Sequence, residues 1–433
     1  MSRELRFIFV PLGSAGDINP LVWLARLMAE RGHEVVIVMQ TAMAEHGHRA
    51  RLRTVPVGAA EEQEAVVRNP DIWHPRRGFR LLAQHFPEWA REMVPAIRHE
   101  LVPGRTVVIG AGIAFGARIV AELERVPLVT AQLQPCIFMS PHDCPVAMRG
   151  MEHLKRWPLW LRRLVFRISN LETDRLLRKP INRLRADLGL HQPVSGILSR
   201  WAQSPDLVLA LFPEWFGPRQ PDWPSQTRLA RFPLYDEAEG RPVSSRLEDF
   251  LRAGPPPILL TPGSANMHAR QFFDAGLAAC RALGRRALLL TPFTEQLPAS
   301  ILPPHLHVDF APFSRVFPRC AAVVHHGGIG TCAQGLAAGV PQLIMAMSHD
   351  QPDNGWRLRQ LGVGRYLYPN QFTAPKVTSA LRDLLESAQV ARACQDARQQ
   401  MDSQIPVETV GELLENFAAR HLGTGKTGKL SNQ

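Results

Sequence analysis

Residues 321–354 read AAVVHHGGIGTCAQGLAAGVPQLIMAMSHDQPDN, in which a short apolar strand runs into a glycine-rich turn and then a helix of small residues. The three glycines between 327 and 330 let the backbone come close to a ligand. The positive end of the helix dipole favours an anion at the same place. His326 and Thr331 add hydrogen-bond donors, and the lysine of a P-loop is missing. The stretch therefore predicts a cradle for a diphosphate.

The alternation of strand and helix extends outward from this stretch in both directions. At the start of the chain, the apolar run 5–10 precedes a loop, a helical pattern that begins near Pro20, and a second apolar run at 34–40. Residues 106–131 repeat the pattern, and it resumes from about residue 255. Alternating strands and helices indicate parallel sheets with helices on their faces. We therefore predict an α/β protein in which two facing Rossmann-like domains enclose a cleft.

The chain has 433 residues, which favours two domains. A polar connection, PLYDEAEGRPVSS, lies between the two alternating regions. We place the N-terminal domain at 1–238 and the C-terminal domain at 239–405. A helix at 406–422 is expected to cross back to the N-terminal domain, and the Gly- and Lys-rich tail 423–433 to be frayed.

Composition narrows the class of protein. Hydrophobic residues make up 45% and charged residues 21%, which excludes a disordered chain. The net charge of +11 favours an anionic partner, although a genome rich in arginine codons explains it equally well. The basic residues are scattered and match no nucleic-acid-binding motif, so no nucleic acid is expected. Six cysteines without a C-x-x-C pair, and no apolar run long enough to span a membrane, indicate a cytoplasmic protein.

Two segments together resemble a known family. The series HHGGIGT, GVPQ and HDQPDN resembles the donor-binding signature of the UDP-glycosyltransferase superfamily, and GSAGDINPLVWLARLMAERGHEV (13–35) is similar to that family's opening loop and helix. The resemblance implies the GT-B fold and an inverting transfer of a sugar from a nucleoside diphosphate. Within the family, residues 69–79 and 211–224 look closest to the rhamnosyltransferase B chains of bacterial rhamnolipid synthesis.

The resemblance also implies a set of donor-binding residues. The donor phosphates would contact the glycine-rich loop and a second loop, through His326, Gly328, Gly330, Thr331 and Ser264. The hydroxyls of the transferred sugar would meet Asp350 and Gln351. Phe310 falls where the family usually has a tryptophan that stacks on the base. Two positions depart from the pattern, because Phe313 replaces a common Gln and Gln334 replaces the Glu that binds the ribose.

A transferase also needs a base beside the acceptor hydroxyl. Asp17 stands where many family members have a histidine, and no aspartate follows the strand near 106–110 to orient one. The resemblance therefore points to Asp17 as a lone catalytic base. The alternative is that Asp17 caps the helix that starts near Pro20, although Asn19 has the better spacing for this.

Three further groups of residues stay ambiguous at this stage. His325 fits a buried strand end as well as a ligand contact, and His349 fits either the sugar site or a bystander position. Asp353 and Asn354 are expected to cap a helix that begins near Gly355 rather than to contact the donor directly.

Aromatic residues in the N-terminal half suggest a hydrophobic acceptor. Trp73, Phe79 and Phe138 are its candidate contacts. The run KRWPLWLRRLVFR (155–167) combines tryptophan, leucine and arginine, which fits either a helix lying on the inner face of an anionic membrane or an ordinary packing helix with a solvated face.

The resulting hypothesis is an inverting, metal-independent glycosyltransferase. It moves a hexose or deoxyhexose from a donor of the dTDP-rhamnose or UDP-glucose type to a hydroxyl of a lipid-like acceptor. No metal ion and no cofactor other than this co-substrate is expected, since no metal-binding spacing is present. The alternatives are a sugar-nucleotide epimerase on the same fold and a non-catalytic partner that binds a nucleotide sugar.

Overall fold

The N-terminal domain is built on a sheet of seven parallel strands. The computed structural model describes residues 4–299 and 301–422. The strand order is β3-β2-β1-β4-β5-β6-β7. The strands are β1 (Arg6–Val10), β2 (Glu34–Gln40), β3 (Arg53–Val57), β4 (Thr106–Ala111), β5 (Leu128–Gln132), β6 (Leu207–Ala210) and β7 (Thr227–Leu229). The central strands are almost entirely buried apolar residues, as expected for a parallel sheet that is covered on both faces.

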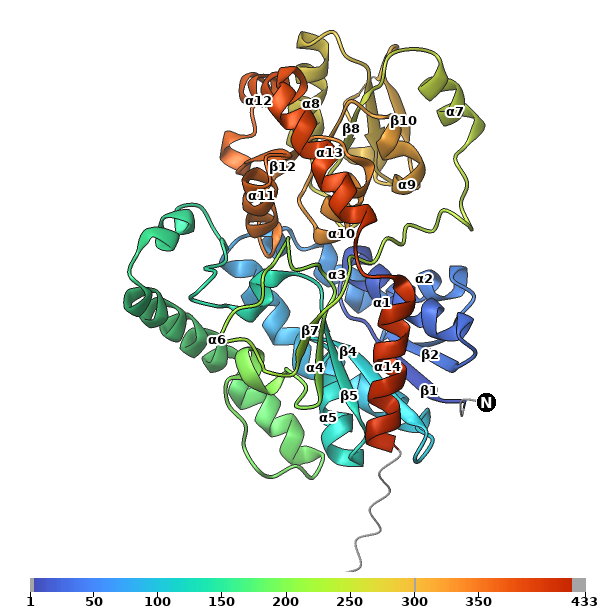
Figure 1. The fold of residues 1–433 in the computed structure, drawn as a ribbon, viewed down its shortest axis with the longest axis vertical. Coiled ribbons are helices and arrows are strands. Elements are labelled where there is room, and N and C mark those ends of the chain that lie inside the picture. Colours follow the sequence, from blue (N-terminus) through green and yellow to red (C-terminus); the bar gives the residue numbers. More distant parts are fainter. Residues whose placement is uncertain (1–3, 300, 423–433) are drawn as a thin grey trace, which may run out of the picture.

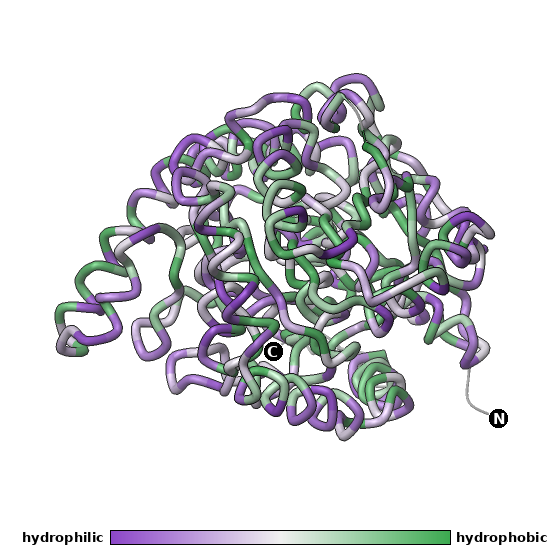
Figure 2. Tube along the Cα trace, turned by 90° about the horizontal axis from the view of Figure 1, so that it is seen from above, coloured by the Kyte–Doolittle hydropathy of each residue, from purple (hydrophilic) through white to green (hydrophobic). Residues whose placement is uncertain are grey.

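Six α-helices connect these strands. They are α1 (Ala15–Glu30), α2 (Ala44–Arg49), α3 (Ala60–Arg68), α4 (Arg77–His99), α5 (Phe115–Glu124) and α6 (Leu159–Asp187). Short 3₁₀ turns occur at Thr41–Met43, Pro70–Trp73, Pro135–Phe138 and Met151–Arg156, and a π-helical turn at Ile197–Trp201. The segment around α6 projects from the left of the molecule and carries both hydrophobic and hydrophilic residues along its length (Figures 1 and 2).

The C-terminal domain repeats the architecture with six parallel strands in the order β10-β9-β8-β11-β12-β13. They are β8 (Ile258–Thr261), β9 (Ala287–Leu290), β10 (Leu306–Val308), β11 (Ala322–His325), β12 (Gln342–Met345) and β13 (Gly364–Leu367). The helices are α7 (Ser245–Arg252), α8 (Arg270–Ala282), α9 (Phe313–Val316), α10 (Ile329–Ala338), α11 (Gln351–Gln360), α12 (Ala374–Glu386), α13 (Ala388–Asp402) and α14 (Val407–Leu422). Further 3₁₀ turns lie at Thr294–Gln296, Phe317–Arg319 and Pro369–Gln371. The two sheets establish the predicted fold class of two Rossmann-like domains.

The last helix returns to the N-terminal domain. In Figure 1, α14 runs down the side of that domain next to α1. Leu414 and Phe417 are buried in the same hydrophobic cluster as β1 and α1. At the far end of α1, the Arg31 guanidinium donates to both carboxylate oxygens of Glu415 at 2.8 and 2.7 Å. The chain therefore crosses between the domains twice.

The two domains meet along α1 and α10. These helices contact each other, and Ile329, Cys332 and Leu336 of α10 belong to the hydrophobic cluster that forms the core of the N-terminal domain. The amino ends of α1 and α10 follow the carboxyl ends of β1 and β11, where ligands bind in open α/β sheets. This junction positions the candidate site.

Some boundaries differ from the sequence-based expectation. Helix α1 begins at Ala15 rather than near Pro20, so that Asp17 and Asn19 lie inside its first turns. Helix α11 begins at Gln351 rather than near Gly355. Residues 159–187, by contrast, form a single long helix, α6, preceded by a short 3₁₀ turn, which agrees with the helical pattern of that stretch. The tail 423–433 lies outside the described residues. Within residues 4–299 and 301–422, no helix is both long enough and apolar enough to cross a membrane.

Candidate active site at the domain junction

Asp17 is held in the first turn of α1 by the residue that precedes the helix. The backbone N–H and the hydroxyl of Ser14 donate to Asp17 Oδ2 at 2.9 and 3.0 Å, which leaves Oδ1 outside these two bonds. Gly13 has a φ of +126°, and a Cβ there would come within 2.5 Å of Asp17 Oδ2, so that only glycine fits. Burial raises the pKa of Asp17, and the bonds from Ser14 offset part of this shift. A tethered carboxylate with a raised pKa suits a general base.

The alternative, that Asp17 is the N-cap of a helix beginning near Pro20, is wrong. The cap residue is Ser14, and Asp17 lies at the third helical position. Asn19 does not cap either, because it lies in the second turn with its Oδ1 buried and unpartnered.

The two histidines at the end of β11 differ in their surroundings. His325 is fully buried, its Nδ1 accepts from the Gly327 N–H at 3.1 Å, and its Nε2 lies 3.0 Å from Gln342 Oε1. Burial lowers the pKa of His325 to about 3, so the ring is neutral and holds the glycine-rich turn in shape. His325 is therefore a structural residue in this loop.

His326 sits between two glycine-containing loops and has an unpaired nitrogen. A Cβ at Gly263 would come within 2.6 Å of the His326 ring, and one at Gly328 within 2.6 Å of its Nε2. Gly263 has a φ of +93° and precedes Ser264, which is exposed. Burial lowers the pKa of His326 to about 4, and its Nδ1 is buried without a hydrogen-bond partner. The fold thus brings His326 and the Ser264 loop together.

Helix α10 begins three residues after His326, and few hydrogen-bond acceptors face the backbone N–H groups of its first turn. Its N-cap is Gly328, which has no side chain with which to bond the first backbone N–H groups. A Cβ at Gly330 would meet nothing within 4 Å, so the space beside the first turn is open. Thr331 is partly exposed in the same turn, whereas Gln334 is buried one turn further along. Backbone N–H groups facing open space are the arrangement that binds phosphate.

Asp350 lies between this helix and Asp17. Burial raises the pKa of Asp350 to about 7, and the charge of Asp17 adds to the shift, whereas hydrogen bonds from Asn354 and the Ile329 N–H lower it. The Asn354 Nδ2 donates to Asp350 Oδ2 at 2.7 Å and to the Gly327 oxygen at 2.9 Å. The electrostatic coupling of the two carboxylates places the predicted base next to a predicted sugar-binding residue.

Gln351 is almost completely buried at the start of α11. Its side-chain oxygen accepts from the backbone N–H groups of Met347 and Ser348 at 3.0 and 3.3 Å. The oxygen therefore shapes the loop after β12, and the NH₂ group is the part of the amide that can donate to a ligand.

The two aromatic residues at positions predicted to bind the donor nucleotide, Phe310 and Phe313, follow β10. The Arg241 guanidinium lies 3.5 Å from the centre of the Phe310 ring. The nucleobase of a donor would therefore have to stack on the opposite face of this ring or displace Arg241. Phe313 opens α9 and stacks on Phe317 at 4.4 Å, in the core of the C-terminal domain. Arg241 comes from the connection between the domains and was not among the sequence-based candidates.

The three predicted acceptor contacts lie in different places. Trp73 packs against the core of the C-terminal domain and lies edge-on to His349, with ring centres 6.2 Å apart. The His349 Nε2 bonds the Ile72 oxygen at 2.9 Å, so this exposed residue joins the two domains. Phe79 packs on the N-terminal core, and Phe138 stacks on Trp223 at 4.0 Å. Among these three, Trp73 is the one that the fold brings to the loop bearing Asp350.

The expectation that Asp353 and Asn354 cap a helix is also wrong. Both lie within α11, and Asn354 bonds Asp350 and Gly327 instead. Asp353 is fully buried, with Oδ1 accepting from the Val146 N–H at 2.9 Å and Oδ2 from Arg357 Nε at 2.8 Å. Asp353 thus connects α11 to the N-terminal domain.

A larger ionic cluster, which the sequence did not reveal, continues this connection. Arg357 also donates to Asp143 at 2.5 Å, and Lys155 donates to the other oxygen of Asp143 at 2.9 Å while lying 3.9 Å over the Trp356 ring. Burial raises the pKa of Asp143, but the charges of Arg357 and Lys155 outweigh it and hold the net pKa below the ordinary value. We call Asp143, Lys155, Asp353 and Arg357 the junction clamp. The clamp fixes α11, whose first turn follows Asp350.

Five of the thirteen buried side-chain polar atoms that have no hydrogen-bond partner in the described residues lie around the same junction. They are the side-chain oxygens of Asn19, Ser348 and Asn354, and ring nitrogens of Trp73 and His326. An unpaired buried polar group costs about 1–3 kcal/mol. These five atoms around Asp17 and Asp350 fit a polar ligand such as a nucleotide sugar.

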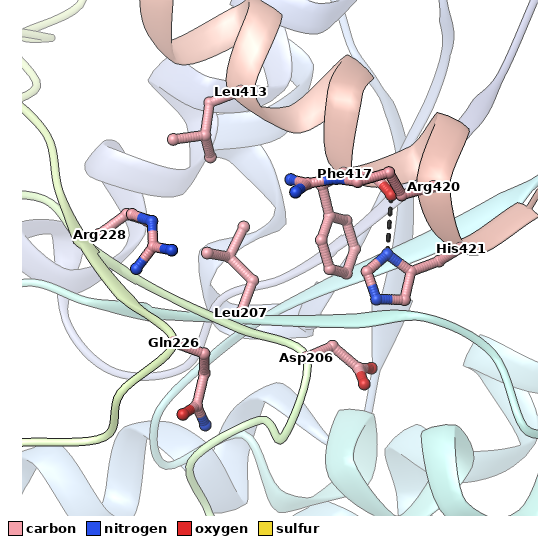
Figure 3. A pocket seen from close by; sticks show the side chains of 8 residues that line it. All are labelled: Asp206, Leu207, Gln226, Arg228, Leu413, Phe417, Arg420 and His421. Atoms are coloured by element: carbon pink, nitrogen blue, oxygen red, sulfur yellow. Dashed lines mark hydrogen bonds between the residues drawn. The ribbon is translucent and has the colours of Figure 1, made fainter.

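A cavity of 140 Å³ lies elsewhere, on the opposite edge of the N-terminal sheet. Figure 3 shows its lining from the amino ends of β6 and β7 and from α14, where His421 Nδ1 bonds the Phe417 oxygen at 2.8 Å. We place the site at the carboxyl ends of the strands because the uncapped helix, the coupled carboxylates and the unpaired polar atoms are there. No group of three or more His, Cys, Asp or Glu residues in the described ranges could hold a metal ion, and independence from metal stays a prediction.

Comparisons with known proteins identify the class. A family model for the C-terminal domain of erythromycin biosynthesis protein CIII-like proteins matches residues 288–416. The chain is 30% identical over 374 residues to O-mycaminosyltylonolide 6-deoxyallosyltransferase of Streptomyces fradiae, covering 83% of this chain and 84% of that protein. It is 31% identical over 399 residues to glycosyltransferase GtfC of Amycolatopsis orientalis, covering 90% and 92%.

Solved structures agree on the fold. Glycosyltransferase VinC in complex with dTDP superposes with a TM-score of 0.69 at 21% identity over 96% of this chain and 100% of that one. Spinosyn rhamnosyltransferase SpnG gives a TM-score of 0.68 at 18% identity over 95% and 100%. The fold is that of the GT-B glycosyltransferases. The chain belongs to the UDP-glycosyltransferase superfamily, whose members are enzymes that transfer sugars. The closer relation to the rhamnolipid rhamnosyltransferases stays a prediction.

Proposed function

We propose that this protein is an inverting glycosyltransferase in which Asp17 removes the proton from an acceptor hydroxyl. The observation that carries the proposal is the position of Asp17, tethered by Ser14 with one oxygen outside that tether and electrostatically coupled to Asp350. The uncapped end of α10 and the unpaired His326 nitrogen lie at the same junction. An alkoxide formed at Asp17 would attack the sugar while α10 and His326 stabilise the departing diphosphate.

The donor is proposed to be a thymidine diphosphate sugar, with dTDP-rhamnose as the first candidate. Gln334 replaces the family's ribose-binding Glu, and a deoxyribose has one hydroxyl fewer to bind. Among the structural neighbours, VinC and SpnG were each solved with thymidine diphosphate. Calorimetry with dTDP and UDP, followed by turnover of dTDP-rhamnose and UDP-glucose, tests this choice. Turnover of UDP-glucose without turnover of dTDP-rhamnose would reject it.

The acceptor is proposed to be a hydrophobic molecule with a hydroxyl group, such as a hydroxy-fatty-acid lipid. Support comes from Trp73, whose ring lies at the junction beside the loop that bears Asp350. The five cysteines that are buried as free thiols fit a reducing compartment, and we place the enzyme in the cytoplasm.

The variant Asp17→Asn tests the catalytic role. Asn keeps a carbonyl oxygen that can accept from Ser14 but cannot take a proton at neutral pH, so turnover should fall about 10²–10⁴-fold while donor affinity changes little. Single-turnover kinetics and calorimetry with the donor nucleotide measure the two quantities separately. Glu61→Gln, an exposed acid in the first turn of α3, is the matched control and should leave both unchanged. Retained turnover above about a tenth of the wild-type value would exclude Asp17 as the base.

A further inference from the structure

The outer face of α6 carries an uncovered apolar stripe. Of the eight large hydrophobic side chains that are exposed in the described residues, six lie between 157 and 176, and Trp160 is the most exposed, at 68%. Four of them, Trp160, Leu164, Ile168 and Leu171, recur every three or four residues within α6 and so share one side of the helix. Trp157 lies two residues before the helix begins. We call these five side chains the stripe, and its helical part spans about 17 Å at 1.5 Å per residue.

The stripe is not the face by which α6 packs on the protein. Phe166, Leu177, Ile181 and Leu184 are buried on another side of the helix, where α6 meets α4 and the small cluster around Cys144. Helix α6 is therefore apolar on two sides, and only one of them has a partner within the chain. A surface helix of a globular protein normally needs only one apolar side.

Unpaired positive charge borders the stripe. Seven exposed basic side chains lie between 156 and 183, and none of them forms an ion pair with a described residue; they are Arg156, Arg163, Arg167, Arg175, Arg178, Lys179 and Arg183. The same stretch has one exposed acid, Glu172. By helical spacing, Arg175 and Arg178 continue the line of the stripe beyond Leu171. This concentration of cations favours an anionic partner.

We infer that this face of α6 docks on the surface of an anionic lipid bilayer. Tryptophan and leucine next to arginine are the side chains that settle at the boundary between headgroups and acyl chains, with the long basic side chains reaching the phosphates. A second copy of the chain fits poorly, because a two-fold contact would bring the seven cations of one stripe against those of the other. The inference does not depend on the donor, the acceptor or the role of Asp17.

Vesicle flotation of the full-length protein tests the inference. The protein should float with vesicles of phosphatidylcholine mixed with phosphatidylglycerol at low salt, bind pure phosphatidylcholine at least about tenfold more weakly, and detach from the mixed vesicles as salt rises. Tryptophan emission should shift to the blue on binding, as Trp160 leaves water. No binding to the anionic vesicles at low salt would overturn the inference.

Two sets of variants locate the binding face. Trp160→Ser with Ile168→Ser and Leu171→Ser, and separately Arg163→Gln with Arg167→Gln and Arg175→Gln, should each reduce vesicle binding at least about tenfold. All six side chains are exposed, so the fold and melting temperature should be unchanged. Leu302→Ser with Ile405→Ser, which alters the two exposed large hydrophobic residues of the described chain that lie outside residues 157–176, is the control and should bind like the wild type. Equal binding by all variants, or a lipid-free dimer that the serine substitutions abolish in sedimentation, would overturn the assignment.

Discussion

Helices α1 and α10 begin in the same way and differ in what occupies their amino ends. Each follows a buried strand and a glycine-containing turn, and the two helices touch at the domain junction. Helix α1 carries its own anion, since Asp17 lies in its first turn and accepts two bonds from Ser14. Helix α10 starts at Gly328 with no acid in its first turn; its Ile329 N–H donates to Asp350 from outside the helix, and the space beside Gly330 is open. Helix α1 thus supplies a carboxylate to the junction, whereas the amino end of α10 favours binding of an anion from a ligand.

The largest effect should come from giving α10 an anion of its own. Gly330→Asp places a carboxylate beside the N–H groups that would bind the donor diphosphate, and repulsion between like charges should lower nucleotide affinity about a hundredfold. The fold should be as stable as the wild type or slightly more so, since an acid in the first turn favours a helix. Calorimetry and thermal unfolding measure the two effects.

Gly330→Asn is the matched control, since it fills the same space without charge. Its loss of affinity should be much smaller than that of the aspartate variant. Equal losses would mean that α10 excludes the ligand by volume alone, and the comparison between the two helices would fail.

A second effect concerns Asp350, which lies between the two helix ends. Because its pKa is raised to about 7 from an ordinary value of 3.8, the folded protein holds a proton there that the unfolded chain has lost. The resulting stabilisation is fully present below about pH 4 and is lost as the pH rises through 7. Asp350→Asn lacks this pH dependence. Between pH 4 and pH 8, its free energy of unfolding should therefore rise by about 2 kcal/mol relative to that of the wild type, after allowance for solvent screening.

Urea unfolding at several pH values measures the stability of Asp350→Asn. Asp249→Asn, an exposed carboxylate in α7, should follow the wild-type curve and serves as control. A constant difference between Asp350→Asn and the wild type at every pH would show that the pKa of Asp350 is not raised in the folded protein.

The smallest effect should come from loosening the tether of Asp17. Ser14→Ala removes a hydroxyl that donates to Asp17 Oδ2, which should cost about 1 kcal/mol of stability. Because this bond lowers the pKa of Asp17, its loss should move the acidic limb of the pH–rate profile to higher pH. Ser387→Ala, the N-cap of α13, should cost similar stability without moving the profile.

The sequence predicted the elements that depend on local pattern. Buried parallel strands appear in the sequence as apolar runs, and the glycines beside His326 indicate the turn before α10. The fold class and this loop could therefore be predicted. The start of α1 was missed because Pro20 looked like a first helical residue, whereas Ser14 and Asp17 form a cap with an aspartate in place of the usual Glu or Gln.

The rest of the site could not be predicted because it depends on contacts between distant residues. Arg357 and Asp143 are 214 positions apart in the sequence, so no local pattern predicts the junction clamp. The same holds for the Arg241 guanidinium on the Phe310 ring and for His349 bonding the Ile72 oxygen. The elevated pKa of Asp350 likewise results from burial and from Asp17, which only the folded chain brings near.

The return of α14 to the first domain has a consequence for how the chain is made. Residues 4–238 cannot complete their hydrophobic core until Leu414 and Phe417 have left the ribosome, because these two side chains fill part of it. The domain that is synthesised first is therefore finished last. A gene fragment that encodes it alone would yield a protein with an exposed apolar strip alongside α1.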